Sequence, residues 1–183
     1  MAQAHSSRRV FLIGFMGAGK TTVGRALASR LGWNFCDLDQ VIESRERKTV
    51  AEIFAGQGEA GFRAAETAAL NELLQAPSGR RDLVVALGGG AFAQLRNREA
   101  LERAGAVTVL LEAPLEELRR RCSADGTLRP LAGDVNRFAE LFEVRRAAYH
   151  LAKYRVNTMG KAVEDVAAEI ERILTAAMPE VKQ

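Results

Sequence analysis

The segment GFMGAGKT, Gly14–Thr21, limits the possible folds of this chain more than any other part of it. It satisfies the pattern G-x-x-x-x-G-K-[ST] at every fixed position. The apolar run Val10–Ile13 comes directly before it, and apolar side chains recur at helical spacing from Lys20 to Leu31. The sequence therefore predicts a buried strand, a glycine-rich loop and a helix in direct succession, which is typical of α/β domains.

A loop of this kind binds phosphate. Its glycines let successive backbone N–H groups curve around an anion, and the N-terminus of the following helix adds its positive dipole end. In this pattern the lysine, Lys20, reaches the β- and γ-phosphates of a nucleotide, and the hydroxyl of Thr21 contacts Mg²⁺. The candidate nucleotide-binding residues are Gly17, Ala18, Gly19, Lys20, Thr21 and Thr22.

A second interpretation of the same region is an export signal. The stretch SRRVFL, Ser7–Leu12, resembles a twin-arginine motif, and Ala26–Ala28 resembles a cleavage site. Lys20 and Arg25 would interrupt the apolar core of such a signal, and cleavage would remove the phosphate-binding pattern. We therefore expect the segment to be retained in a cytoplasmic protein.

Composition narrows the class of protein. A chain of 183 residues, 48% hydrophobic and 27% charged, suits one globular domain, here residues 1–183 with a short N-terminal extension at 1–8. The longest apolar run, Val10–Met16, is far shorter than the roughly 20 residues of a membrane span. The net charge of +3 is mild, and arginines alternate with acids, so neither nucleic acid nor a membrane is an expected partner. Two cysteines and two histidines provide no zinc set.

Along the chain, short apolar runs alternate with amphipathic stretches, which favours a parallel sheet with helices. We expect strands at 10–13, 34–37, from 82 into a triple-glycine turn at 88–90, in the stretch AVTVLLEA before Pro114, and at 153–158. We expect helices at 20–31, from a capping box at Thr49–Glu52, at 61–75, after Pro114, up to about Leu151, and at 163–178. The Ser-, Gly- and Pro-containing stretch at 122–135 is expected to be a mobile loop.

A phosphate-binding loop alone does not specify the reaction, so the class of enzyme must be inferred from motifs elsewhere in the chain. The GTPase patterns D-x-x-G and N-K-x-D do not occur, and Glu112 is a poor candidate for the acid of a mechanical ATPase. Asp37 and Asp39 follow the second predicted strand, where ligands gather in parallel sheets. They are candidates for metal and substrate binding, and a polar cap of a following helix is the alternative.

Several motifs occur in a fixed order: the phosphate loop, D-x-D at Asp37–Asp39, GEAGFRAAE at 58–66, LGGG at 87–90, RPL at 129–131 and R-x-x-x-Y at 145–149. In this order the chain resembles the shikimate kinases from Val10 to about Thr158. The resemblance implies a P-loop kinase of the nucleoside-monophosphate-kinase type, with a five-stranded parallel sheet flanked by helices and a mobile lid. It also implies transfer of phosphate from MgATP to the 3-hydroxyl of shikimate, a step toward chorismate and the aromatic amino acids.

The resemblance carries roles onto individual positions. Asp39 matches the acid that binds shikimate hydroxyls and orients the attacking oxygen, and Asp37 matches the acid near Mg²⁺, through water. Arg63 and Arg145 match the pair that grips the substrate carboxylate, and Arg129 matches the lid arginine over the phosphates. Glu66 matches the acid that holds Arg63 in place, and the turn Gly88, Gly89 and Gly90 lets the substrate approach closely. The catalytic candidates are thus Lys20, Asp39 and Arg129.

Some points remain open at this stage. Either Arg120 or Arg121 is the residue near adenine, and the segment after Thr158 has no residue that matches an expected adenine contact. Arg146 adjoins Arg145, and the spacing to Tyr149 favours Arg145. Ala132 replaces a frequent leucine of the family. A gluconate-kinase-like enzyme or a regulatory nucleotide-binding module is the alternative function, and a monomer is expected.

Overall fold

The structure is a computed structural model that describes residues 8–75, 82–124 and 135–178. The strands are β1 (Arg9–Ile13), β2 (Asn34–Asp37), β3 (Leu83–Ala86), β4 (Val107–Glu112) and β5 (Tyr154–Asn157). The helices are α1 (Lys20–Leu31), α2 (Leu38–Glu46), α3 (Val50–Gln75), α4 (Leu95–Arg103), α5 (Leu115–Ala124), α6 (Val135–Tyr149) and α7 (Val163–Ala177).

The five strands form one sheet in the order β2-β3-β1-β4-β5, and every neighbouring pair is parallel. The central strand β1 is apolar and buried from Val10 to Ile13, as expected for a parallel strand that is covered on both faces. The prediction of a five-stranded parallel sheet is confirmed. Predicted strand positions agree with the observed ones to within one residue at most ends.

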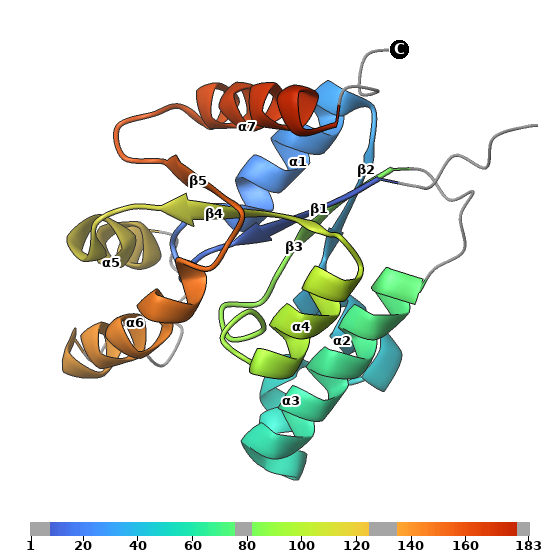
Figure 1. Cartoon of the computed structure of the whole chain (residues 1–183). Coiled ribbons are helices and arrows are strands. Elements are labelled where there is room, and N and C mark those ends of the chain that lie inside the picture. Colours follow the sequence, from blue (N-terminus) through green and yellow to red (C-terminus); the bar gives the residue numbers. More distant parts are fainter. Residues whose placement is uncertain (1–7, 76–81, 125–134, 179–183) are drawn as a thin grey trace, which may run out of the picture.

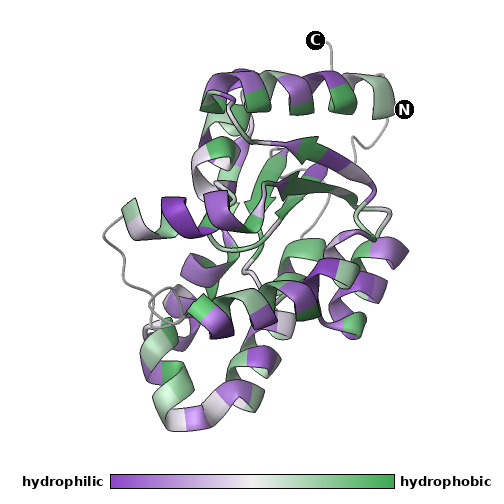
Figure 2. Cartoon of the chain, turned by 90° about the vertical axis from the view of Figure 1, so that its left-hand side faces the viewer, coloured by the Kyte–Doolittle hydropathy of each residue, from purple (hydrophilic) through white to green (hydrophobic). Residues whose placement is uncertain are grey.

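Helices cover both faces of the sheet (Figure 1). α1 and α7 pack together over one face, whereas α2, α3 and α4 lie on the other side. Figure 2 shows the hydrophobic strands in green inside helices whose outer surfaces are largely hydrophilic. The core therefore lies on the two faces of the sheet, and the loops at the carboxyl ends of the strands are left for ligands.

Glycines determine where α1 begins and ends. Gly19 before it (φ 87°) and Gly32 after it (φ 66°) both adopt the left-handed conformation. That conformation costs other L-residues energy and is the usual way to end a helix. The sequence prediction for this helix is therefore met at both ends.

The helix α3 combines two predicted helices. The capping box is present, because Glu52 accepts from the Thr49 N–H at 2.7 Å and Thr49 Oγ1 accepts from the Glu52 N–H at 3.2 Å. The helix is then interrupted at Gly58, whose φ of 66° is not helical. The kink separates the first part from the part that carries Arg63 and Glu66.

The helix α4 has no counterpart among the predicted elements, and α2 is expected only in the alternative interpretation of Asp37 and Asp39 as a polar cap of a following helix. α2 starts immediately after β2, with Asp37 as its N-cap, so no loop separates strand from helix. Gln94, the N-cap of α4, makes no side-chain capping bond, so the usual capping signal is missing from the sequence.

Of the two arginines of the suspected export signal, Arg8 directly precedes the sheet and Arg9 belongs to it. The Arg8 guanidinium bonds to Asp82 at 2.9 Å, and Arg9 is the first residue of β1 and donates to the Leu74 carbonyl at 2.8 Å. Over the described residues, no helix has the length and apolarity that crossing a bilayer requires.

Candidate active site

The phosphate loop lies between β1 and α1, as predicted. Gly14, Gly17 and Gly19 all have positive φ, and a Cβ at Gly14 or Gly17 would collide with the backbone oxygens of Leu111 or Leu118. Glycine is therefore required for both the loop conformation and its close packing. Lys20 Nζ donates to the carbonyls of Gly14 and Phe15 at 2.8 and 3.0 Å.

The first pair of polar groups beyond the loop is Thr21 and Asp37. Thr21 Oγ1 donates to Asp37 Oδ2 at 2.7 Å, and Asp37 Oδ1 accepts from the Asp39 N–H at 3.1 Å. Asp37 thus caps α2 with one oxygen and meets the loop threonine with the other. The helix-cap interpretation of the D-x-D motif is therefore compatible with a metal-site role, since each uses a different oxygen.

Within the described part of the chain, no cluster of three or more His, Cys, Asp or Glu side chains could hold a metal ion.

A cleft of about 610 Å³ joins these groups. Its walls come from the phosphate loop, the ends of β2 and β3, the helix α5 and the segment after β5. The lining includes Gly17 to Thr22, Asp37, Asp39, Gly88, Gly89, Glu117, Arg120, Arg121, Thr158 and Lys161. The cleft therefore runs from the nucleotide candidates to the substrate candidates Asp39, Gly88 and Gly89, whereas Arg63, Gly90 and Arg145 are not part of its lining.

The triple-glycine turn is where the substrate candidates converge. A Cβ at Gly88 would stand 2.7 Å from Asp39 Oδ1, and one at Gly89 would stand 3.3 Å from an Arg145 guanidinium nitrogen. A Cβ at Gly90 would collide with the Arg63 guanidinium, at 2.4 Å from one of its nitrogens. Asp39, Arg63 and Arg145 come from α2, α3 and α6, and each is packed against a different glycine of the turn.

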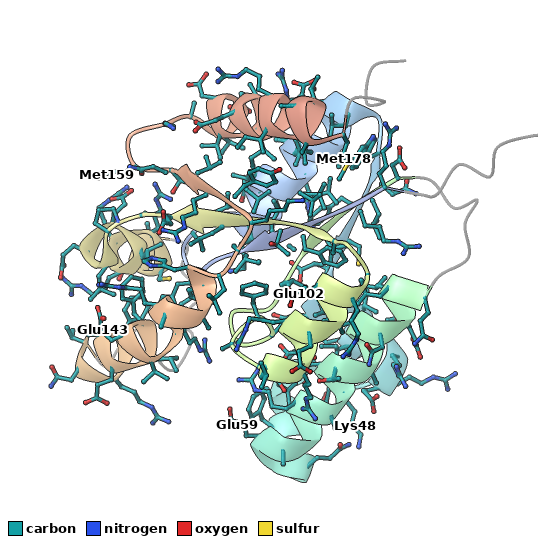
Figure 3. The ribbon with its side chains drawn as sticks, viewed as in Figure 1. Lys48, Glu59, Glu102, Glu143, Met159 and Met178 are labelled. Carbon is teal, nitrogen blue, oxygen red and sulfur yellow. The ribbon has the colours of Figure 1, made fainter. Side chains whose placement is uncertain are left out.

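Glu66 lies beneath this cluster with only 1% of its surface exposed. Its Oε2 accepts from Arg63 at 3.0 Å and from Gln94 Nε2 at 2.5 Å. Burial raises the pKa of Glu66, and the opposing effect of the Arg63 charge only partly offsets it. Glu59 also accepts from Arg63, at 3.2 Å, and lies on the side of α3 nearer to α6 (Figure 3). The guanidinium is therefore held by two acids on its own helix.

Arg145 and Arg146 have different surroundings. Arg145 is half-buried and lies over the Phe15 ring at 5.9 Å, beside the Tyr149 hydroxyl. Tyr149 donates to the Gly89 carbonyl, and its burial raises the pKa of this phenol to about 12. Arg146 is exposed and meets only Glu143, at 3.5 Å, among the ion pairs of the described residues. The structure thus brings Arg145, and not Arg146, to the turn.

On the other side of the cleft, Arg121 spans from α5 to the segment after β5. Its guanidinium donates to Thr158 Oγ1 and to the Thr158 carbonyl, both at 3.0 Å. Arg120 is 68% exposed and pairs with Glu117. Hydrogen bonds from Arg120 and then Arg121 lower the pKa of Glu117 to about 2. Both arginines line the cleft. Arg121 hydrogen-bonds to both Glu117 and Thr158, whereas Arg120 hydrogen-bonds to Glu117.

Several neighbours of the site did not emerge from the sequence: Gln94, the contact of Tyr149 with Gly89, and Lys161 at the cleft. Gln94 and Gly89 meet partners 28 and 60 positions away, and no local pattern signals such contacts. Arg129 and most of the segment 122–135, the predicted lid, lie outside the described residues.

Residues 16–175 match the family model described as shikimate kinase. The chain belongs to the shikimate kinase family. The match covers the phosphate loop from Met16 onward, the glycine turn and α6, and includes Asp39, Arg63 and Arg145.

Individual relatives agree with this assignment. The chain is 46% identical over 168 residues to a shikimate kinase of Geobacter metallireducens, with 90% of each chain covered. A solved shikimate kinase of Acinetobacter baumannii in complex with shikimate is 37% identical, with a TM-score of 0.83 and 95% and 96% of the two chains covered. The Aquifex aeolicus shikimate kinase structure is 33% identical with a TM-score of 0.79, over 93% and 98% of the chains. These results favour the shikimate kinase interpretation over the gluconate-kinase-like and regulatory alternatives.

Proposed function

We propose that this protein transfers the γ-phosphoryl group of ATP to the 3-hydroxyl of shikimate, yielding shikimate 3-phosphate and ADP. Membership of the shikimate kinase family supports the activity. The observation that carries the site assignment is the convergence of Asp39, Arg63 and Arg145 on the glycine turn at the end of β3, next to the phosphate loop at the end of β1.

The nucleotide occupies the loop half of the cleft in this proposal. Backbone N–H groups from Gly17 to Thr22 and the N-terminus of α1 bind the phosphates, while Lys20 turns toward the β- and γ-phosphates. Thr21 and Asp37 offer the oxygens that Mg²⁺ prefers, and the ion would neutralise charge on the phosphates. Arg121 lies on the adenine side, because it lines the cleft and is fixed by Thr158.

Shikimate occupies the other half. It carries a carboxylate and hydroxyls, so it needs cations at one end and an acceptor at the other. Arg63 and Arg145 bind the carboxylate, for which a planar guanidinium is well shaped. Asp39 accepts from the attacking hydroxyl and takes its proton as the oxygen bonds to the γ-phosphorus and the bond to ADP breaks. These roles are consistent with the positions of the three side chains around the turn.

Arg129 completes the proposed machinery from the resemblance alone, as the lid arginine that stabilises the charge of the transferring group. We also propose a single-domain, monomeric, cytoplasmic enzyme that acts on small molecules and uses neither nucleic acid nor a membrane. The mild charge and the modest apolar runs of the sequence support this.

A coupled assay of ADP release, with ATP and Mg²⁺ present, tests the activity. Release should depend on shikimate and should not respond to gluconate at the same concentration. Release that is indifferent to shikimate would favour a regulatory module, and release driven by gluconate would favour the other kinase. Omitting Mg²⁺ should abolish turnover, and binding of ATP to the metal-free protein should weaken.

A further inference from the structure

The polar contacts beneath the glycine turn extend beyond Arg63 and Glu66 to a residue that the proposed mechanism does not use. Gln94 donates through Nε2 to Glu66 Oε2 at 2.5 Å, across 28 positions of sequence. The same carboxylate oxygen accepts from Arg63 at 3.0 Å. Glu66 is thus held from two sides, by its own helix and by the N-terminus of α4.

The orientation of the Gln94 amide is fixed by a second arginine. Arg96 donates to Gln94 Oε1 through Nε at 3.1 Å and through a terminal nitrogen at 2.7 Å. An arginine can only donate, so the Gln94 carbonyl must face Arg96 and its NH₂ group must face Glu66. Arg96 also donates to the Arg63 carbonyl at 3.0 Å, which ties the start of α4 to the backbone of α3.

Gln94 occupies a position where a side chain usually caps a helix. It is the N-cap of α4, but its side chain makes no capping bond, because it is directed to Glu66. A serine, threonine or aspartate would cap the helix better, yet each is too short to replace this contact. The Gln94 side chain therefore stabilises Glu66 rather than the N-terminus of α4.

From this geometry we propose that Gln94 is a positioning residue for shikimate binding: its amide orients Glu66, and Glu66 in turn holds the Arg63 guanidinium at Gly90. The inference rests on the proposed function for its effect on shikimate. The contact between Gln94 and Glu66 differs from a purely structural one, because it affects the protonation and orientation of a buried acid. The substrate-binding residue Arg63 depends on that acid for its position.

The protonation of Glu66 depends on the charged groups that face it, and this dependence provides a test of the Gln94 contact. Arg63 and Arg145 favour its ionised form, whereas burial and the negative charge of Asp39 oppose it. Loss of the Gln94 donor removes a further stabilisation of the carboxylate. The pKa of Glu66 should therefore rise in the variant, so that Glu66 becomes protonated and loosens its hold on Arg63 at a higher pH than in the wild type.

The variant is Gln94→Met, which keeps the shape of the side chain and removes both polar groups. We expect KM for shikimate to rise about tenfold, the usual effect of one lost hydrogen bond to a charged group. KM for ATP should stay unchanged, and the acidic limb of kcat/KM for shikimate should move to higher pH. Gln94→Glu, which sets a second carboxylate against Glu66, should bind shikimate more weakly still at neutral pH and recover as the pH falls.

The matched control is Gln75→Met, at an exposed glutamine in the last turn of α3. It should leave both KM values and the pH profile unchanged. Combining Gln94→Met with Glu66→Gln should add little to the effect of Glu66→Gln alone, because both act through the same carboxylate.

Titration of Glu66 by carboxyl ¹³C NMR in the wild type and in Gln94→Met needs no substrate. A higher midpoint in the variant is expected, and equal midpoints would overturn the proposal whatever the substrate is. An unchanged KM for shikimate and an unmoved acidic limb in Gln94→Met would also overturn it. A wild type that does not use shikimate would instead contradict the proposed function, which separates the two failures.

Discussion

The hydroxyl of Thr21, in the first turn of α1, donates at 2.7 Å to Oδ2 of Asp37, the last residue of β2, although the two residues lie 16 positions apart. The contact joins the phosphate loop after β1 to the acidic turn after β2, with β3 between these strands in the sheet. The oxygens proposed for Mg²⁺ are thus already held together by the fold. Substitutions at the loop can therefore be expected to affect chemistry more than packing.

Thr21→Val and Lys20→Met should each abolish measurable phosphoryl transfer. Stability should fall by only about 1–2 kcal/mol, the usual net loss for one or two hydrogen bonds. Turnover and thermal melts should be measured on the same samples. Thr175→Val, which removes a hydroxyl bond to the Glu171 carbonyl on α7, is the control and should keep full activity. Wild-type turnover in either loop variant would contradict the nucleotide-site assignment.

Asp39→Asn should reduce kcat by about 10²–10⁴-fold, the range that general-base help is worth. ATP affinity should change little, because Asp39 lies against Gly88 rather than in the phosphate loop. Steady-state kinetics and ATP titration provide the two readouts. If the variant lost ATP binding and kept shikimate binding, the roles proposed for Asp37 and Asp39 would have to be exchanged.

Arg63→Ala and Arg145→Ala should each weaken shikimate binding by tenfold or more, since a charge-assisted hydrogen bond is worth about 1.5–3 kcal/mol. Arg146→Ala is the matched control, because it removes the same type of side chain from the neighbouring, exposed position. Calorimetric titration with shikimate gives the comparison. A larger defect in Arg146→Ala would show that the wrong arginine has been assigned to the carboxylate.

Gly90→Ala should raise KM for shikimate, because its methyl group would displace the Arg63 guanidinium. Gly56→Ala provides the control: nothing lies within 4 Å of the added Cβ, and the position is helical. Alanine there should stabilise the protein by about 0.5–1 kcal/mol. Both variants should be compared by shikimate kinetics and by urea unfolding. Normal shikimate kinetics in Gly90→Ala would mean that the close approach is not needed.

Glu66 should make stability depend on pH in a defined direction. Burial raises its folded-state pKa above the ordinary value of 4.5, so the folded protein holds the proton more tightly than the unfolded chain. The contribution is present below the unfolded pKa and is lost as the pH rises through the folded pKa. Glu66→Gln should remove this slope. Urea midpoints of wild type and variant, measured from pH 4 to pH 8, give the difference, and parallel curves would exclude the effect.

The sequence predicts the sheet and most helices because strand and helix periodicities are local. It predicts α2 only through the alternative interpretation of Asp37 and Asp39 as a helix cap, because no loop separates β2 from the helix. It does not predict α4, because the Gln94 side chain is committed to Glu66. Separate helices are expected at Thr49–Glu52 and 61–75, and the structure joins them through the left-handed Gly58.

At the site, motif order brings Asp39, Arg63 and Arg145 forward as candidates, and the structure places them around one turn. The sequence patterns do not identify the residues that position these three side chains. Gln94 belongs to no motif, and the R-x-x-x-Y motif does not signal the contact of Tyr149 with Gly89. The partners of both side chains are distant in sequence. Such contacts depend on how α4 and α6 pack, which is decided by the whole fold rather than by a local stretch.

The register of the sheet has one more consequence. β1, which ends in the phosphate loop, is hydrogen-bonded along its length to β3, which ends in the glycine turn. Neighbouring strands lie about 4.8 Å apart, so the platform for the phosphoryl donor and the platform for its acceptor are held one strand spacing from each other by backbone hydrogen bonds. In the proposed reaction, the separation between phosphoryl donor and acceptor is thereby set by the hydrogen-bonded sheet itself.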